Sequence, residues 1–371
     1  MRRWKMIKTK LIHPHYSGEE LSLIQAVLES EHLVDGPMTR EFESLIKTIT
    51  GARHAVACTS ATTGMEMALR VLGVGPGDEV VIPAFTHPAT GLAVLTVGAT
   101  PVIVDVDLAT RNTTLERMRE VITDKTRVLM PVSWGGHPLK AKPMLEYCNQ
   151  RNLYLIDDAA CSLGTRWEGA STGSVAHFTV FSFHPRKIIA TGDGGCVVTN
   201  NSEWADQMAS YKNFGTTRVA GRPVFEFVGT NQRFPSILAA LGVAQLRQID
   251  RIIARRRELA QRYQMLLAGV AHMELPIEES GAFHNFQTYA VRLDSKWNRD
   301  QVMKKLRQEG IEVQIGSTAI HREPVFREAK ISGDLKNAEN LADQLLALPL
   351  HHKLKESDQK FVAKRLMELT Q

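Results

Sequence analysis

The sequence is poor in cysteine. Its 371 residues include four cysteines, namely Cys58, Cys148, Cys161 and Cys196, and none stands in a Cys-x-x-Cys pair. This number and spacing exclude a disulfide-stabilised scaffold and a cysteine-rich zinc module. The basic N-terminus is not followed by the apolar stretch that a secretory signal needs. We therefore expect reduced thiols and a cytoplasmic protein.

Long apolar runs and nucleotide-binding fingerprints are also missing. The most apolar window, residues 91–106, is short and is interrupted by glycine, proline and polar residues, which excludes a membrane-spanning helix. No Gly-x-Gly-x-x-Gly follows a strand and opens a helix, and there is no P-loop. The glycines of residues 73–77 precede their strand, which is the wrong order for a dinucleotide fold.

The net charge is only +5, and the basic residues are spread along the chain. The densest basic stretch outside the N-terminus, residues 251–257, lies in a helical pattern and is expected to be a solvated face. Nucleic-acid binding would rest on phosphate contacts and weaken steeply with salt. Neither a recognition helix nor interleaved basic and aromatic residues supports it. A non-catalytic regulatory protein stays an alternative that rests on the basic balance alone. A positive pocket for an anionic substrate is also compatible with that balance.

The first two thirds of the chain alternates short apolar strands with helices. The strands are expected near residues 80–82, 101–104, 127–132, 153–156, 178–183 and 196–199. Continuously apolar strands separated by helices indicate a mostly parallel sheet covered on both faces. After residue 200, long helices (237–267) lead into a smaller alternation, with strands at 288–293 and 311–315 and helices at 300–308, 338–346 and 357–369. We predict a large domain over residues 1–250 and a small C-terminal domain over residues 251–371.

Two groups that can carry chemistry follow strand ends. Asp157 and Asp158 end the strand in "LYLIDDAA", and Lys187 stands past the strand in "FSFHPRKIIATGDGG". The carboxyl ends of strands in an open α/β sheet are where ligands bind. A lysine and an acid at that edge form either an ion pair or a catalytic pair, and an aspartate at a strand end can also cap a helix.

A phosphate site is conceivable at the same edge. Ser60-Ala61-Thr62 opens a helix, and a helix start attracts anions through its free N–H groups and its dipole. Ordinary N-capping is the alternative. Ser182 could add a hydroxyl. A lysine, an aspartate and a phosphate cradle together suit pyridoxal phosphate (PLP), whose aldehyde condenses with an amine and whose protonated ring withdraws electrons.

At this point the sequence resembles the DegT/DnrJ/EryC1/StrS family of sugar aminotransferases. The matching stretches are "GPGDEVVIPAFTHPAT", "GATPVIVDVD", "LIDDAACSLG", "VFSFHPRKIIATGDGGCVVTN" and "GTNQRFPSILAALGVAQL", with weaker matches in "EGIEVQIG" and "LALPLHHKL". The resemblance covers residues 17–369. It implies an α/β PLP-dependent transferase of fold type I (aspartate aminotransferase-like), a homodimer, and transamination of a nucleotide-linked keto-sugar with L-glutamate as amino donor.

The resemblance also implies roles for single residues. Lys187 would be the Schiff-base lysine and proton carrier, and Asp158 would pair with the pyridinium nitrogen. The remaining cofactor-binding positions would be Ala61, Thr62 and Ser182 at the phosphate, His87 stacked on the ring, Cys161 beside it, and Asn231. Asn231 matches an asparagine that reaches the partner subunit's cofactor, so the active site would be shared.

Four departures from the family pattern concern the substrate side. Cys161 replaces a frequent glutamine, Ser133 and Phe214 each replace a frequent histidine, and Gly316-Ser317 replaces a frequent His-Tyr pair. They leave the sugar unidentified.

The sequence disfavours a dehydratase and a metal site. A sugar dehydratase of the same fold replaces the lysine with histidine, so Lys187 argues against it. A metal at His351-His352 is not expected, because adjacent histidines point apart and no cysteine or carboxylate pattern surrounds them.

Overall fold

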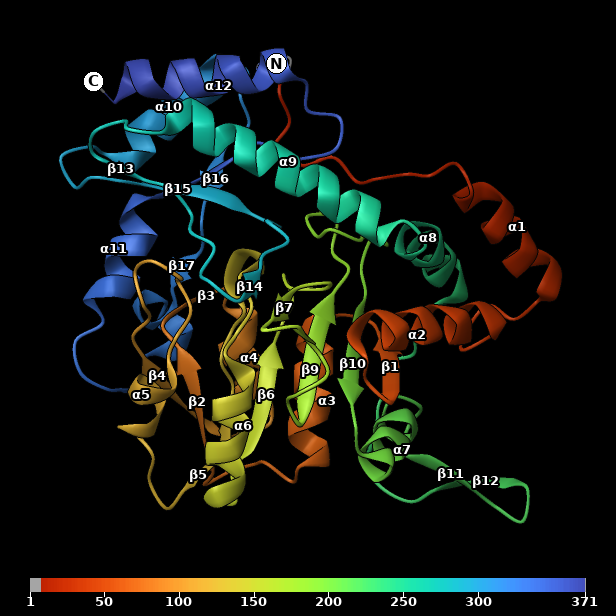
Figure 1. Ribbon diagram of the computed structural model, residues 1–371. Coiled ribbons are helices and arrows are strands. Elements are labelled where there is room, and N and C mark those ends of the chain that lie inside the picture. Colours follow the sequence, from red (N-terminus) through yellow and green to blue (C-terminus); the bar gives the residue numbers. More distant parts are fainter. Residues whose placement is uncertain (1–7, 371) are drawn as a thin grey trace, which may run out of the picture.

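The computed structural model describes residues 8–370 (Figure 1). Within these residues the largest sheet has eight strands, in the order β1-β10-β9-β6-β5-β2-β4-β18. Its strands are β1 (His54–Cys58), β2 (Glu79–Pro83), β4 (Thr100–Val104), β5 (Thr126–Leu129), β6 (Tyr154–Asp158), β9 (Phe178–Ser182), β10 (Gly195–Thr199) and β18 (Lys330–Ile331). Seven of these strands run in the same direction, and β10, which lies between β1 and β9, runs in the opposite direction. The prediction of a mostly parallel sheet is confirmed.

Helices cover both faces of this sheet, which explains why its strands are mostly apolar. Val80 and Ile82 of β2 pack on one face with α3 (Ala61–Val71), α4 (Ala89–Thr96) and α7 (Ser202–Tyr211), while Val81 packs on the other face with α5 (Leu115–Arg119) and α6 (Ala141–Gln150). Toward β1 and β10, that second face carries α2 (Pro37–Thr50) and α8 (Ser236–Leu246). The N-terminal helix α1 (Glu20–Ser30) packs on α8.

A second, antiparallel sheet lies in the C-terminal third, in the order β13-β15-β19-β16. It comprises β13 (Met273–Glu274), β15 (Tyr289–Leu293), β19 (Leu345–Leu348) and β16 (Gln314–Ile315), and it packs with α9 (Ile249–Leu267), α10 (Arg299–Gln308) and α12 (Glu356–Leu369). The predicted helix 338–346 was wrong at its end, since α11 (Lys336–Gln344) stops before β19. All four residues of β19 are buried, and Pro349 follows them, which disfavours a helix just before it.

Short strands connect the two parts of the chain. β14 (Ala282–Phe283) pairs with β7 (Arg166–Trp167), which also pairs with β8 (Ala170–Ser171). β17 (Thr318–Ala319) pairs with β3 (Phe85–Thr86), and β18 joins the large sheet beside β4. The last hairpin, β11 (Thr216–Val219) with β12 (Arg222–Phe225), projects from the body in Figure 1. The division at residue 250 stays a prediction.

A cluster of four histidines joins the N-terminal segment, which carries His13 and His15, to the segment after β19, which carries His351 and His352. The ring centroids of His13 and His351 lie 5.9 Å apart, those of His13 and His352 5.4 Å, and those of His15 and His352 4.7 Å. The pKa of both His351 and His352 is lowered to about 4. Burial is the larger cause, and repulsion from the neighbouring histidines is the smaller one. The folded protein therefore keeps these rings neutral.

This cluster predicts acid-sensitive stability. Below the usual histidine pKa of 6.5 the unfolded chain takes up protons that the folded chain does not, so stability is lost as the pH falls from about 6.5 toward 4. For the buried His351 alone we expect a loss of about 2 kcal/mol between pH 7 and pH 5. Urea unfolding of His351→Leu at both pH values should show a loss smaller by that amount than the wild type, whereas a control at exposed His32 (His32→Gln) should behave as wild type. Equal losses in all three proteins would contradict the account.

Candidate active site

Lys187 sits in a compact turn after β9. Its backbone N–H donates to the His184 carbonyl at 2.8 Å, and Phe183 closes the turn by accepting from the Thr191 N–H and donating to the Gly194 carbonyl, each at 2.9 Å. Gly194 has a φ of +157°, and a Cβ there would meet the Phe234 ring at 2.8 Å. The glycines after Lys187 thus let the chain return directly into β10. The side-chain Nζ of Lys187 donates to Cys161 Sγ at 3.1 Å.

Asp158 ends β6, the parallel neighbour of β9. Its carboxylate is buried and accepts hydrogen bonds from the Thr90 hydroxyl at 2.7 Å and the Ala160 N–H at 3.2 Å. Burial raises its pKa, while these two bonds and the Lys187 amine favour the ionised form. The carboxylate is therefore placed where a cationic group would stabilise it.

The adjacent Asp157 points to the opposite face of the sheet, as alternation along a strand requires. It accepts a hydrogen bond from the Ser133 hydroxyl at 2.8 Å, and burial raises its pKa to about 7. It lines a separate cavity with Thr179 and Lys142. Of the two aspartates, only Asp158 belongs to the cavity that contains Lys187.

The start of α3 forms the third part of the site. Ser60 caps the helix through its hydroxyl, which accepts from the Thr63 N–H at 3.1 Å, and the Thr63 hydroxyl accepts in turn from the Ser60 backbone N–H at 3.1 Å. The N–H groups of Ala61 and Thr62 have no acceptor within residues 8–370. Two unpaired N–H groups at a helix start are suited to an anion such as a phosphate.

These parts surround a single cavity of about 440 Å³. Its walls include the predicted Ala61, Thr62, His87, Asp158, Cys161, Ser182 and Lys187. Burial, followed by the nearby Lys187 amine, lowers the pKa of His87, which favours a neutral ring. An amine, a buried carboxylate and an anion-binding helix start around one cavity fit PLP, so the residues present suit the cofactor.

Asn231 lies elsewhere. It is exposed on the segment after the β11–β12 hairpin, where it accepts a hydrogen bond from Arg233 and pairs with Asn213. It does not line the cavity of its own chain.

The four departures divide in the same way. Gly316 and Ser317 line the cavity, as does Cys161. The expectation that all four positions border the substrate side was wrong for Ser133, which is buried on the Asp157 side. Phe214 lies under the Arg233 guanidinium near Asn231 and does not line the cavity of its own chain, so its place beside the substrate stays a prediction. Within residues 8–370 no three histidine, cysteine or acidic side chains are grouped so as to hold a metal ion.

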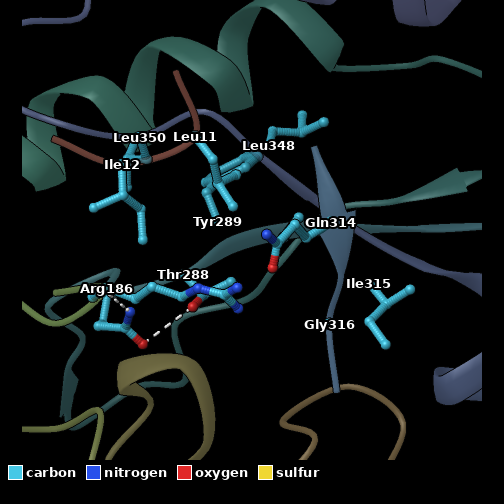
Figure 2. A pocket seen from close by; sticks show the side chains of 12 residues that line it. Leu11, Ile12, Arg186, Thr288, Tyr289, Gln314, Ile315, Gly316, Leu348 and Leu350 are labelled. Atoms are coloured by element: carbon cyan, nitrogen blue, oxygen red, sulfur yellow. Dashed lines mark hydrogen bonds between the residues drawn. The ribbon is translucent and has the colours of Figure 1, made fainter. Parts of the chain in front are cut away.

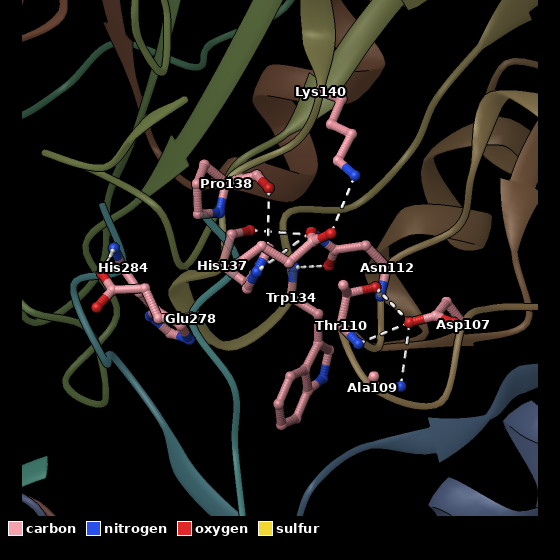
Figure 3. Close-up of polar contacts among 11 residues, drawn as sticks. Asp107, Ala109, Thr110, Asn112, Trp134, His137, Pro138, Lys140, Glu278 and His284 are labelled. Carbon is pink, nitrogen blue, oxygen red and sulfur yellow. Dashed lines mark hydrogen bonds and ion pairs between the residues drawn. The ribbon is translucent and has the colours of Figure 1, made fainter. Parts of the chain in front are cut away.

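Sequence reasoning missed Trp134, which also lines the cavity. Its backbone N–H donates to Asn112 Oδ1 at 2.8 Å, and the Asn112 side-chain amide donates to the His137 carbonyl at 3.2 Å (Figure 3). The Arg111 guanidinium lies 5.2 Å from the indole centroid. The signal that could have identified Trp134 is its position in the segment "VSWGG", which follows strand β5 at the same edge of the sheet.

Comparison with known proteins agrees with this geometry. Residues 14–367 match the DegT/DnrJ/EryC1/StrS aminotransferase family. The chain belongs to this family. It is thus a PLP-dependent aminotransferase of fold type I, as the sequence predicted.

Similar proteins align over nearly their whole length. GDP-perosamine synthase of Caulobacter vibrioides is 35% identical over 349 residues, which cover 93% of this chain and 94% of that protein. The crystal structure of the aminotransferase TlmJ from Streptoalloteichus hindustanus has a TM-score of 0.92 at 29% identity, covering 97% and 98% of the two chains. DesI, solved in the presence of its TDP-sugar product, has a TM-score of 0.88 at 29% identity, covering 95% and 90%. In the described part of the chain no helix is long and apolar enough to cross a membrane.

The close approach of β10 to α3 yields a stability prediction. A Cβ on Gly195 would overlap the Ser60 carbonyl group and lie 2.6 Å from the Ala61 nitrogen. Because backbone cannot move aside like a flexible side chain, Gly195→Ala should lower the free energy of unfolding by about 2–3 kcal/mol. It should also weaken PLP retention by displacing the helix start. Gly75→Ala, whose Cβ would meet nothing closer than 3.8 Å, is the control. Chemical denaturation and PLP titration measure both effects, and wild-type values for Gly195→Ala would contradict this packing.

Proposed function

We propose that this aminotransferase transfers the amino group of L-glutamate to a nucleotide-linked keto-sugar. The observation that carries the proposal is the placement of Lys187 and Asp158 on one cavity with the free N–H groups of α3. The names of GDP-perosamine synthase and of DesI with its TDP-sugar product support the class of acceptor. Lys187 disfavours the dehydratase alternative, which lacks a lysine at this position. The product would feed surface polysaccharide or a glycosylated metabolite, and the site of action would be the cytoplasm.

Each side chain has a defined task in this proposal. PLP, when bound, withdraws electrons so that the Cα–H bond of the donor ionises. Lys187 Nζ would hold the cofactor between turnovers and, once released, would accept the proton from the donor Cα and later deliver a proton to the carbon of the acceptor that receives the amine. Asp158 keeps the ring nitrogen protonated, because its buried carboxylate stabilises a facing positive charge. His87 covers the ring face.

Phosphate binding completes this set. Ala61 and Thr62 would donate their free N–H groups to the phosphate, and Ser182 would add its hydroxyl. Cys161, at a position where family members frequently have glutamine, accepts a hydrogen bond from the Lys187 amine. In this proposal its thiol lies beside both the amine and the cofactor.

Transfer of the amino group from glutamate tests the proposal. The PLP-loaded protein mixed with L-glutamate, without a sugar, should form about one 2-oxoglutarate per subunit, since the cofactor is not regenerated. Lys187→Ala should react at least about 100-fold more slowly, because the proton carrier is lost. Enzymatic assay of 2-oxoglutarate after rapid quenching measures both rates. Equal rates for the two proteins would contradict the role of Lys187.

A homodimer with shared active sites is part of the proposal. Asn231 is exposed and away from its own cavity, and the neighbouring Phe225 and Val228 are 71% and 92% exposed. Apolar side chains so exposed beside a projecting hairpin are suited to contact with a second copy. In that dimer Asn231 reaches the partner's cofactor phosphate.

Hybrid dimers test this sharing. Asn231→Ala alone should lose PLP more readily than the wild type. When it is mixed with inactive Lys187→Ala under conditions of proven subunit exchange, each hybrid dimer regains one site without a lesion. Equal mixing should then restore about a quarter of wild-type activity, because half of the dimers are hybrids. If mixing restores nothing, the cross-subunit role is wrong.

A further inference from the structure

Residues 284–288, here called the clasp, connect three loops that line the active-site cavity. The clasp lies between β14 and β15. The Asn285 amide donates to the carbonyl groups of Cys161 and Leu163, each at 3.0 Å. The Thr288 N–H donates to the Gly135 carbonyl at 3.0 Å. One short segment of the C-terminal third thus holds the loops that follow β5 and β6.

Gln287 of the clasp holds the third loop, the one that carries Lys187. Its Nε2 donates to the Arg186 carbonyl at 2.8 Å. The Thr288 hydroxyl donates to Gln287 Oε1 at 3.1 Å, which orients the amide so that its nitrogen faces Arg186. Figure 2 shows Arg186 and Thr288 in a smaller pocket that Leu11 and Tyr289 also line and that shares Arg186, Gln287 and Thr288 with the active-site cavity; the two bonds are drawn as dashed lines. Gln287 is 5% exposed, so water does not readily replace the bond.

The clasp is itself held from α9. The Arg256 guanidinium donates to the carbonyl groups of Phe286 at 3.0 Å and Gln287 at 2.6 Å, and to that of Leu350 at 3.0 Å. Arg256 is buried, and no carboxylate of residues 8–370 pairs with it. The expectation of a solvated face at residues 251–257 is therefore wrong for Arg256. Two of its donors hold the clasp backbone, and a third binds the Leu350 carbonyl.

The Arg186–Lys187 peptide is consequently fixed at both ends. Its carbonyl accepts from Gln287, and its N–H, which belongs to Lys187, donates to the His184 carbonyl. A peptide unit is planar, so holding both ends sets the position of the Lys187 Cα, the point from which its side chain extends. The flanking His184, Pro185 and Arg186 are exposed and offer little packing of their own.

We propose that Gln287 is a positioning residue for the reaction: it orients the peptide before Lys187 and so aims the amine into the cavity. This inference rests on the proposed function, in which Lys187 is the reactive amine. Gln287 acts through Lys187, and its loss leaves the proposed contacts of Asp158, Ala61 and Thr62 with the cofactor in place but lets the lysine-bearing turn move.

Substitution of Gln287 tests this role. Gln287→Met keeps the length of the side chain and removes the donor, and Thr288→Val removes the hydroxyl that orients Gln287. The matched control is Gln264→Met, because Gln264 makes the same kind of bond, to the Pro276 carbonyl at 2.6 Å, far from the cavity-lining residues. Hydrogen exchange of the unliganded proteins, followed on peptides spanning residues 184–190, reports the turn directly.

We expect exchange of the Lys187 amide to be about 10-fold faster in Gln287→Met, intermediate in Thr288→Val and unchanged in Gln264→Met. In the loaded enzymes, kcat should fall about 10-fold in Gln287→Met with the KM for glutamate nearly unchanged, because the amine is mis-aimed while substrate contacts remain. The pH dependence of the bound cofactor's absorbance should shift in the same variant.

Two results would overturn the proposal. One is a wild-type exchange rate of the Lys187 amide and a wild-type kcat in both single variants, Gln287→Met and Thr288→Val, when both are folded. The other is an equal change in Gln264→Met, which would reveal a general loss of stability. Failure of the proposed function has a different signature, since wild-type Lys187 would then fail to retain PLP while the exchange contrast on the unliganded proteins would persist.

Discussion

Burial of the Asp158 carboxylate beside an open cavity is the constraint on which the site depends. A buried carboxylate is costly unless hydrogen bonds and positive charge stabilise it. Thr90 and the Ala160 N–H supply the bonds, and Lys187 supplies a charge within the same cavity. The sheet order makes this possible, since β6 and β9 are parallel neighbours and present their following loops at one edge. The order of the strands therefore determines where the cofactor binds, independently of any contact with the substrate.

The cofactor set could be predicted because its signals are local. Lys187, Asp158 and the Ala61–Thr62 helix start each stand directly after or before a regular element, and residues at such boundaries in an α/β sheet meet at one edge. The sequence could not supply the strand order that brings them together, because that order depends on long-range pairing. The alternation that turns Asp157 and Ser133 away from the cavity was available in principle, but the adjacent aspartates carry no mark of which one faces the ligand.

The contacts that hold the site rigid were not predictable in the same way. Arg256 sits in a basic helical stretch that looks solvated, and its three carbonyl partners come from segments 30 to 94 residues away. Gln287 and Asn285 belong to no periodic pattern, so nothing local indicates that their amides bind loop carbonyls. Polar side chains that satisfy buried backbone groups at long range are set by tertiary structure alone. The same holds for β19, whose four buried residues read equally well as the end of a helix.

The central claim is that Lys187 is the amine that holds the cofactor. The most direct test is borohydride reduction of the PLP-loaded protein, followed by proteolysis and mass spectrometry of the peptides. The account predicts one phosphopyridoxyl group per subunit, on the peptide that contains Lys187, and none in Lys187→Ala. Attachment to another lysine, or a protein that stays colourless and unmodified after incubation with PLP, would contradict it.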